Sequence, residues 1–237
     1  MEWIINVRTL DMRRKLRFLL LFGTVLAGFV PALRAQEARW VITHSWEGQG
    51  TRQTRMFPIN GTRWKIRHKH TGRGLFQISV YDEEGNLLDL AANLSEPIAG
   101  VTTLPGRGKR YLAISGINTE WEVTVEQYLS VIEEWQLTQV MQKPDPPLRK
   151  LATWFGGDAD VEYELAVSEG SWKIVHSNTG GGVFQVIVRG EDQERFVALA
   201  ANTSEPEESE SWVHRNGAFH LRIKAENTEW KVDVYGR

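Results

Sequence analysis

The chain contains no cysteine among its 237 residues. This absence excludes disulfide bonds, thiol nucleophiles, thiolate zinc sites and a lipidated N-terminal cysteine. A large excess of charge of either sign is also missing, since 28 basic residues stand against 30 acidic ones and the formal net charge is −2. We therefore expect no nucleic-acid partner, because such a partner favours a strongly basic surface.

Long hydrophobic runs are missing as well, apart from one segment near the N-terminus. A basic stretch at 13–17 precedes an apolar run at 18–33, and the small Ala35 is followed by the polar Gln36. A basic start, a short apolar run and a small residue before a polar region are typical of a secretory signal peptide. We predict that residues 1–35 are a signal peptide cut after Ala35, and that the protein is exported to the periplasm or the cell exterior.

Two alternatives to this signal-peptide prediction stay open. The apolar run is shorter than the roughly 20 residues that span a bilayer as a helix, but retention of the segment as an N-terminal anchor is the alternative to cleavage. Met12 is an alternative start codon to Met1, because residues 1–11 add nothing that a signal peptide needs. After cleavage we expect no membrane span.

The rest of the chain repeats itself. Residues 64–68 and 172–176 share the pattern Trp-Lys-Ile-x-His at an offset of 108. At an offset of 109, residues 91–97 match 200–206 (Ala-Ala-Asn-x-Ser-Glu-Pro) and 118–121 match 227–230 (Asn-Thr-Glu-Trp). An order-preserving match of this length indicates a duplicated unit. We predict two copies of one module, at about 40–127 and 151–237, joined by a connector at 128–150.

The connector has its own pattern. Its apolar positions fit one stripe of a short helix, with Glu133 and Glu134 on the solvent side. The apolar positions are Val131, Ile132, Trp135 and Val140. The Pro-rich run at 143–147 then ends the helix and stiffens the connector.

Each copy alternates apolar and polar residues with a period of two. Residues 121–126 and 230–234 show it most clearly, and turn sequences such as Asn60-Gly61 lie between the alternating segments. This is typical of antiparallel strands with one buried and one solvated face. With about eight short strands per copy, we predict an all-β fold of two tandem antiparallel β-sandwich domains, of jelly-roll or CUB-like type, with a short helical, Pro-rich connector.

The ten tryptophans fall into this scheme. Those in phase with the apolar positions of their strands are expected in the core, because an indole buries up to roughly 250 Å². They are Trp64, Trp121, Trp172 and Trp230, and we expect Trp46 and Trp154 to follow them. Trp212 lies beside the acidic run 205–210 in a predicted loop, and it is our candidate for an exposed ligand contact.

The order of elements in one copy resembles a known group of secreted domains. The segment 76–88 ends in an Asp-Glu-Glu-Gly-Asn turn, is followed by Gly-Lys-Arg-Tyr-Leu-Ala-Ile at 108–114, and a last alternating strand closes the module. This order resembles the bacterial pre-peptidase C-terminal domains and other CUB-like sandwiches. The resemblance implies a non-catalytic accessory or adhesion module, and it carries over no binding residue.

The most specific shared stretch is the Ala-Ala-Asn-x-Ser-Glu-Pro loop. Asn and Ser side chains can bond to nearby backbone groups and Pro fixes the exit, so a shaped turn explains the loop. Since loops often carry function, a ligand-binding loop is the other interpretation. The candidate ligand-binding residues are Asn93, Ser95 and Glu96 in the first copy, and Asn202, Ser204 and Glu205 in the second.

Sequence motifs for catalysis are lacking. The chain has no Gly-x-Ser-x-Gly elbow, no His-Glu-x-x-His pair and no Gly-rich phosphate loop between a strand and a helix. His68 and His176 occur in both copies on the apolar phase of their strands, and we expect both in the core. No carboxylate is spaced to complete a metal site around His68 and His70. We therefore predict no catalytic residue, no metal and no cofactor.

The two copies differ in charge. The first has 10 basic against 9 acidic residues, and the second has 8 against 15. On the strand 63–69 the basic residues occupy the polar phase and predict one basic face. Its members are Arg63, Lys65, Arg67 and Lys69. This face is either solvated, or docks on an anionic polymer or partner, or pairs with the acidic second copy.

These observations lead to three hypotheses of different kinds. The first is an exported, non-catalytic binding or adhesion protein whose partner is a glycan, a peptide or an envelope protein. The second is a structural component of a bacterial envelope or extracellular assembly. The third is an enzyme. The ligand and the oligomeric state stay open.

Overall fold

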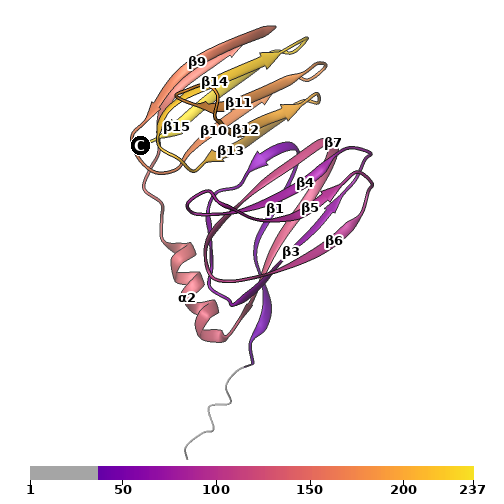
Figure 1. Cartoon of the computed structure of the whole chain (residues 1–237), viewed down its shortest axis with the longest axis vertical. Coiled ribbons are helices and arrows are strands. Elements are labelled where there is room, and N and C mark those ends of the chain that lie inside the picture. Colours follow the sequence, from indigo (N-terminus) through magenta and orange to yellow (C-terminus); the bar gives the residue numbers. More distant parts are fainter. Residues whose placement is uncertain (1–36) are drawn as a thin grey trace, which may run out of the picture. The chain divides into compact units, whose positions relative to one another are not determined.

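A computed structural model describes residues 37–237. The signal-peptide prediction for residues 1–35 lies outside the described residues. Residues 38–237 form one compact unit built almost entirely of strands, with the helix α2 (Val131–Gln142) following the first half (Figure 1). The all-β prediction is confirmed. Within the described range, no helix is both long and apolar enough to cross a membrane.

The second half of the chain forms two sheets of four strands. The strands are β8 (Arg149–Gly156), β9 (Ala159–Val167), β10 (Trp172–Asn178), β11 (Phe184–Gly190), β12 (Phe196–Thr203), β13 (Glu207–Val213), β14 (Gly217–Ala225) and β15 (Trp230–Gly236). One sheet has the order β13-β10-β15-β8 and the other β12-β11-β14-β9. The antiparallel pairs are thus nested, from β11·β12 at the centre to β8·β15 at the ends. This nesting is the strand order of a jelly roll.

The first half uses the same nested pairing with longer strands. The strands are β1 (Arg39–Gln53), β2 (Phe57–Ile59), β3 (Arg63–His70), β4 (Phe76–Asp82), β5 (Leu87–Leu94), β6 (Ala99–Pro105) and β7 (Gly108–Leu129). β4 pairs with β5, β3 with β6, and β7 with β1, β2, β3 and β4. Because β1 and β7 run on from one layer into the other, the strands of this half belong to one seven-stranded sheet.

Tryptophans at matched positions fill the two cores. Trp64 and Trp172 are 1% and 0% exposed, and Trp121 and Trp230 are also buried, as predicted. The Trp121 Nε1 donates to the carbonyl oxygen of Gly50 at 3.1 Å, and the Trp230 Nε1 donates to that of Gly157 at 2.7 Å. A buried indole N–H usually has such a partner.

Each half has its own hydrophobic cluster. Trp46 is partly buried against the first cluster and Trp154 against the second, in agreement with the expectation for both. Because residues 38–237 nevertheless form one compact unit, the division into two tandem domains at 40–127 and 151–237 stays a prediction.

The connector forms the predicted helix in the opposite orientation. Ser130 and Glu133 make a reciprocal capping box at the start of α2, which explains why the helix begins there. Glu133 and Glu134 face the protein and pair with Arg107 and Arg39, at 2.5 and 3.0 Å. The apolar residues predicted to be covered are exposed instead; these are Val131, Ile132, Trp135 and Val140. The prediction was wrong because the two arginines, which come from distant parts of the sequence, draw the carboxylates inward.

Candidate functional site

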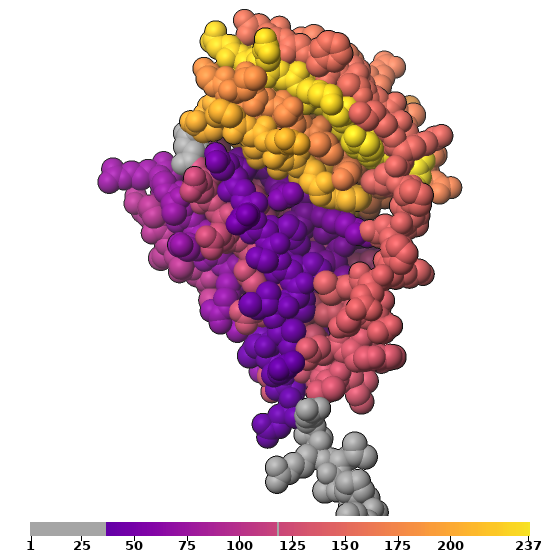
Figure 2. All heavy atoms as spheres, turned by 180° about the vertical axis from the view of Figure 1, so that it is seen from behind, coloured from indigo at the N-terminus to yellow at the C-terminus, as the bar shows by residue number. Residues whose placement is uncertain are grey.

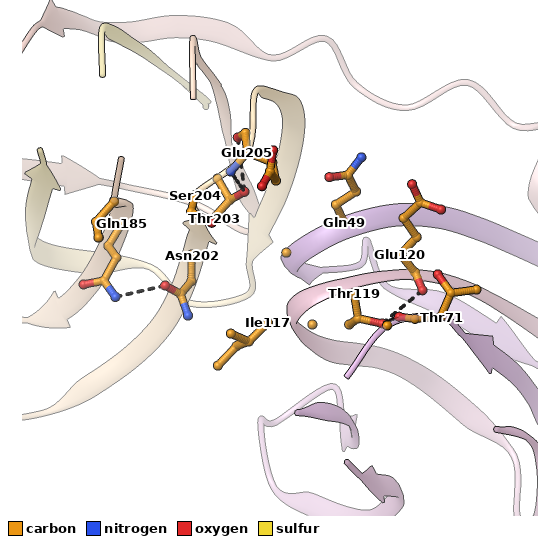
Figure 3. A pocket seen from close by; sticks show the side chains of 14 residues that line it. Gln49, Thr71, Ile117, Thr119, Glu120, Gln185, Asn202, Thr203, Ser204 and Glu205 are labelled. Atoms are coloured by element: carbon orange, nitrogen blue, oxygen red, sulfur yellow. Dashed lines mark hydrogen bonds between the residues drawn. The ribbon is translucent and has the colours of Figure 1, made fainter. Parts of the chain in front are cut away.

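A polar groove lies where the two halves meet. Its main hollow has a volume of about 530 Å³ and is lined from both halves (Figure 3). Side chains of Gln49, Thr71, Thr119 and Glu120 line one side, and side chains of Gln185, Asn202, Thr203, Ser204 and Glu205 line the other. A second hollow of about 280 Å³ also includes Gln49, Thr71 and Glu120, so the groove continues along the first half. The volume of the main hollow is within the range of small-molecule sites.

The wall from the first half depends on a glycine. The register of β1 against β7 shifts between Gln49 and Thr51, and Gly50 has a φ of +63° at this point. A Cβ atom at Gly50 would lie 2.9 Å from Oε2 of Glu207 and 3.1 Å from the backbone oxygen of Asn202. The left-handed backbone and the close approach of the second half both require glycine there.

The wall from the second half is the predicted loop after β12. Gln185 donates through Nε2 to Oδ1 of Asn202 at 2.9 Å, and the backbone N–H of Glu205 donates to Oγ1 of Thr203 at 3.1 Å. Asn178 holds the loop from inside by donating through Nδ2 to the carbonyl oxygen of Glu205 at 2.9 Å. Asn202 therefore lies at the end of β12, and Ser204 and Glu205 lie on the turn that follows it, which is shaped by its own hydrogen bonds; both parts line the groove.

The matching loop of the first half lies elsewhere. Asn93, Ser95 and Glu96 are exposed, and none of them lines the groove. The structure thus brings together only one of the two predicted sets of ligand-binding residues. Sequence alone could not separate them, because the difference arises from the contact between the halves.

Trp212 does not lie in a loop, as the sequence had suggested. It is part of β13, pairs with Lys173 of β10 and is partly buried. Its ring centroid is 5.7 Å from the Arg55 guanidinium and 5.8 Å from the Lys173 ammonium, and its Nε1 donates to Glu210 at 3.2 Å. The sequence prediction mistook the acidic run 205–210 for a loop. In the structure, its side chains alternate between a neighbouring strand and the joint, which is the contact between the two halves.

Arginines of the first half dock on this joint. Arg52 donates through Nε to the carbonyl oxygen of Glu210 at 3.0 Å, and the backbone N–H of Gln53 donates to Oγ of Ser211 at 2.9 Å. His214 Nε2 lies 2.8 Å from the carbonyl oxygen of Thr54, which can only accept, so this nitrogen carries the proton. Among the described residues, however, no ion pair joins the basic first half to the acidic second half: Arg52 donates to a backbone carbonyl, and Arg55 pairs with Asp145 of the connector and lies near the Trp212 ring.

The predicted basic face is partly neutralised by its own sheet. Lys65 pairs with Glu126 of β7 at 2.8 Å and Arg67 pairs with the same carboxylate. Lys69 lies opposite Glu122 in the register of β3 and β7. Two cations of this face also lie near aromatic rings. The Lys65 ammonium is 4.1 Å from the ring centroid of Trp40, and the Arg63 guanidinium is 4.7 Å from that of Tyr128.

The groove itself is acidic. Its lining contains the carboxylates of Glu47, Glu120, Glu122 and Glu205 and a single ammonium group, that of Lys69. Ile117 and Val183 add two exposed apolar side chains to the main hollow. An anionic ligand would be repelled here, whereas a neutral or cationic one with several hydroxyl or amide groups would find donors and acceptors on both walls.

Partly buried titratable groups lie at the joint, and sequence reasoning missed two of them. Burial raises the pKa of Glu207 to about 7, against the opposing effects of a hydrogen bond with Ser209 and the charge of Arg52. Burial likewise lowers the pKa of His214 to about 4. The available signal was the alignment of the two copies, in which Glu207 matches the exposed apolar Ile98.

The two histidines shared by the copies are buried in the cores. His68 lies with its ring 5.7 Å from that of Phe76, and His176 lies 5.6 Å from Phe184. Burial lowers the pKa of both, that of His176 to about 4. Over residues 37–237, no three His, Asp or Glu side chains gather as a metal site would need.

Comparisons with known proteins leave the family open. No family model matches the chain, and no curated protein matches it in sequence. The resemblance to pre-peptidase C-terminal and CUB-like domains thus receives no support from a family or sequence match.

Solved structures give only distant likenesses. The PBSX exported protein XepA is 11% identical, with 83% of this chain and 85% of that chain covered and a TM-score of 0.27. A conserved protein of unknown function from Pseudomonas aeruginosa PAO1 is 10% identical, with 83% and 82% covered and a TM-score of 0.26. YhaK from Escherichia coli is 11% identical, with 82% and 85% covered and a TM-score of 0.24. Scores this low support neither a fold nor a function for this chain, so its jelly-roll order rests on its own strand pairing.

Proposed function

We propose that the protein is an exported, non-catalytic binding protein whose ligand lies in the groove between the two halves. The observation that carries this proposal is the lining of the main hollow, in which polar side chains from distant parts of the chain converge on a volume of about 530 Å³. Export rests on the basic and apolar segments before residue 36. The lack of a catalytic role rests on the missing sequence motifs.

The ligand we propose is a neutral or cationic glycan segment. The amides of Gln49, Gln185 and Asn202 can each donate and accept, which suits neighbouring hydroxyl groups of a sugar. Ile117 and Val183 can contact the apolar face of a sugar ring. The excess of carboxylates in the lining disfavours anionic polymers, and an extended peptide is the competing ligand.

Preorganisation favours binding at this place. The loop with Asn202 and Glu205 is held by hydrogen bonds to Gln185, Thr203 and Asn178 before any ligand arrives. A site whose side chains are already ordered loses less conformational entropy on binding. A freely moving loop would lose part of its affinity in becoming ordered.

With this function we also propose that the two halves are tandem copies of one jelly-roll domain. Support comes from the same nested order of strand pairs in both halves and from the matched places of Trp121 and Trp230. In this view the ligand site did not exist in either copy alone. It arose when the loop after β12 came to face the end of β1.

A co-sedimentation experiment tests the proposed function. The full chain is mixed with insoluble neutral, cationic and anionic polysaccharides and with peptidoglycan, at low and high salt. We expect binding to a neutral or cationic polymer that weakens by roughly tenfold in Gln185→Ala/Asn202→Ala, since two hydrogen bonds to the ligand are lost.

The matched control is Gln77→Ala/Asn93→Ala, which makes the same change at the matching positions of β4 and β5, outside the groove. It should bind as the unmodified chain does. Equal losses in both double variants, or binding to anionic polymers alone, would contradict a ligand site in the groove. Binding only to the peptide part of peptidoglycan would replace the glycan by a peptide.

A further inference from the structure

The outward face of α2 is apolar and carries no charge. Ile132 and Trp135 are 69% and 62% exposed, and Val131 beside them is also exposed. At 100° per residue these three side chains share one side of the helix, and Gln139 and Gln142 continue that side. Figure 2 shows the helix at the surface of the molecule, next to the first residues of β1.

The charged residues of the helix are all turned away from this face. Glu133 and Glu134, its only charged residues, pair with Arg107 and Arg39 on the protein side. Leu137, on the same side, is the buried contact of α2. A solvated connector would show its carboxylates to water, so this arrangement indicates that the outward face meets an apolar environment.

The chain itself indicates what that environment is. Arg39, which holds the first turns of α2 through Glu134, is only six residues beyond Leu33, the end of the apolar run at 18–33. Six residues span at most about 20 Å. If the apolar run is kept as a membrane anchor, which is the alternative to cleavage after Ala35, the uncharged face of α2 is therefore within reach of that membrane's surface.

We propose that the outward face of α2, with Val131, Ile132 and Trp135, lies on the lipid surface of the membrane that holds the N-terminal segment. Tryptophan favours the boundary between lipid and water, because its ring is apolar and its N–H is polar. The absence of outward charge favours a shallow contact driven by apolar area rather than by anionic lipid. The contact concerns the full chain and is independent of the ligand in the groove.

This contact would also orient the protein. β1 runs from Arg39 beside α2 to Gln49 at the groove, and ten residues of strand span about 33 Å. With α2 on the lipid surface, the groove would point away from the membrane and stay open to ligands.

The lack of cysteine makes a site-specific test simple. Ile132→Cys in the full chain carries the chain's one thiol, which is labelled with an environment-sensitive fluorophore. Phe155→Cys is the matched control, because Phe155 is an apolar residue of β8 that is 78% exposed. Both labelled chains are reconstituted in vesicles of neutral phospholipid, with and without a spin-labelled lipid as quencher.

We expect the label at 132 to shift its emission to the blue and to be quenched by the spin-labelled lipid, while the label at 155 does neither. Trp135→Glu added to Ile132→Cys should reduce the quenching severalfold, since a charge at the lipid boundary is unfavourable. Circular dichroism checks that each exposed substitution leaves the fold intact.

Two results would overturn the proposal. Equal quenching at 132 and 155, or none at either, would show that α2 does not rest on lipid. A blue shift at 132 without quenching, which grows with the ratio of protein to lipid, would show that a second copy of the chain covers the helix instead.

Discussion

The loop after β5 and the loop after β12 have nearly the same sequence and lie in different surroundings. Each belongs to a stretch that reads Ala-Ala-Asn-x-Ser-Glu-Pro, at 91–97 and 200–206, whose first four residues end the strands β5 and β12. The first loop is exposed, whereas the second lines the groove and is held by Asn178, which donates to the carbonyl oxygen of Glu205. Its position against the other half, and not its sequence, gives the second loop access to a binding site.

The structural cause of the difference is the end of β1. Arg52 and Gln53 of the first half bond to Glu210 and Ser211 of β13. In the first half, β6 takes the place that β13 has in the second half. A symmetric contact of the second half on β6 would need a second molecule, so within one chain only β13 receives this contact. Because the end of one copy packs on the side of the other, the two copies have different surroundings. Ligand binding can therefore be confined to one of the two matching loops.

The largest effect on the free energy of unfolding is expected in the two cores. Trp64→Ala and Trp172→Ala should each lower the free energy of unfolding by about 3–5 kcal/mol, as is usual for a buried tryptophan. Trp172 Nε1 donates to the carbonyl oxygen of Arg215 at 2.9 Å, whereas Trp64 Nε1 is buried with no hydrogen-bond partner among the described residues.

Phenylalanine at these two positions isolates the contribution of the indole N–H. We expect Trp172→Phe to destabilise by about 1–2 kcal/mol more than Trp64→Phe, because only the former leaves a carbonyl oxygen without its donor. Urea unfolding of both variants measures the difference. Equal losses would mean that the two tryptophans are equivalent in energy as well as in position.

Acid should destabilise both halves and the joint through histidines whose pKa burial lowers. The pKa of His176 is lowered by burial from 6.5 to about 4, so the unfolded chain binds a proton between these values that the folded chain does not. Stability is therefore complete above pH 6.5 and is lost as the pH falls toward 4, by about 3 kcal/mol from this histidine alone.

Burial lowers the pKa of His44 and of His214 to about 4 in the same way, and both add to this loss. Unfolding free energies between pH 8 and pH 4 test the prediction, with His176→Gln as the variant. Its slope against pH should be shallower by roughly a third. An unchanged slope would show that His176 is not the group that titrates.

Much of the fold could be predicted from alternation, because alternation reports burial within one strand. Trp121 and Trp230 were placed in the core on this basis, and both are buried. The orientation of α2 could not be predicted in the same way. Its carboxylates are drawn inward by Arg39 and Arg107, which lie 95 and 26 residues from their partners.

Only part of the candidate site could be predicted from the sequence. The loop with Asn202 and Glu205 was found because its sequence is repeated, but repetition gave equal weight to Asn93. Gln49, Glu120 and Gln185 were missed, since each looks like an ordinary polar position of a strand or turn. Only the packing of one half on the other brings them together.

Glu207 at the joint differs most from its counterpart, because the matching residue of the first half is the exposed Ile98. The pKa of Glu207 is raised from 4.5 to about 7, mainly by burial. The folded chain therefore holds a proton that the unfolded chain releases above pH 4.5, and stability falls as the pH rises toward 7.

Glu207→Gln should remove this loss. We expect the variant to be more stable than the unmodified chain at pH 8.5, by about 1–3 kcal/mol, and nearly equal to it at pH 4.5. Thermal unfolding at the two pH values measures the effect. A variant that is less stable at pH 8.5 would mean that the ionised carboxylate has a partner that stabilises it, with Arg52 the nearest candidate.

The smallest effect on the free energy of unfolding is expected for the basic face of β3. Its charge alone would suggest a large effect. Arg67 and Lys65 share Glu126, whose side chain is 10% exposed, but Arg67 itself is 52% exposed. Arg67→Ala leaves Lys65 on the carboxylate and should lower the free energy of unfolding by less than about 1 kcal/mol, with the difference vanishing in high salt.

Lys65→Ala should be more harmful, because Lys65 is only 12% exposed and its ammonium also lies over the Trp40 ring. Urea unfolding at low and high salt compares the two variants. A loss for Arg67→Ala that is larger and persists in high salt would mean that this face is built around Arg67. The expected order, with Lys65 ahead of Arg67, instead implies that the strand's charges mainly balance Glu126 and that ligand binding is left to the groove.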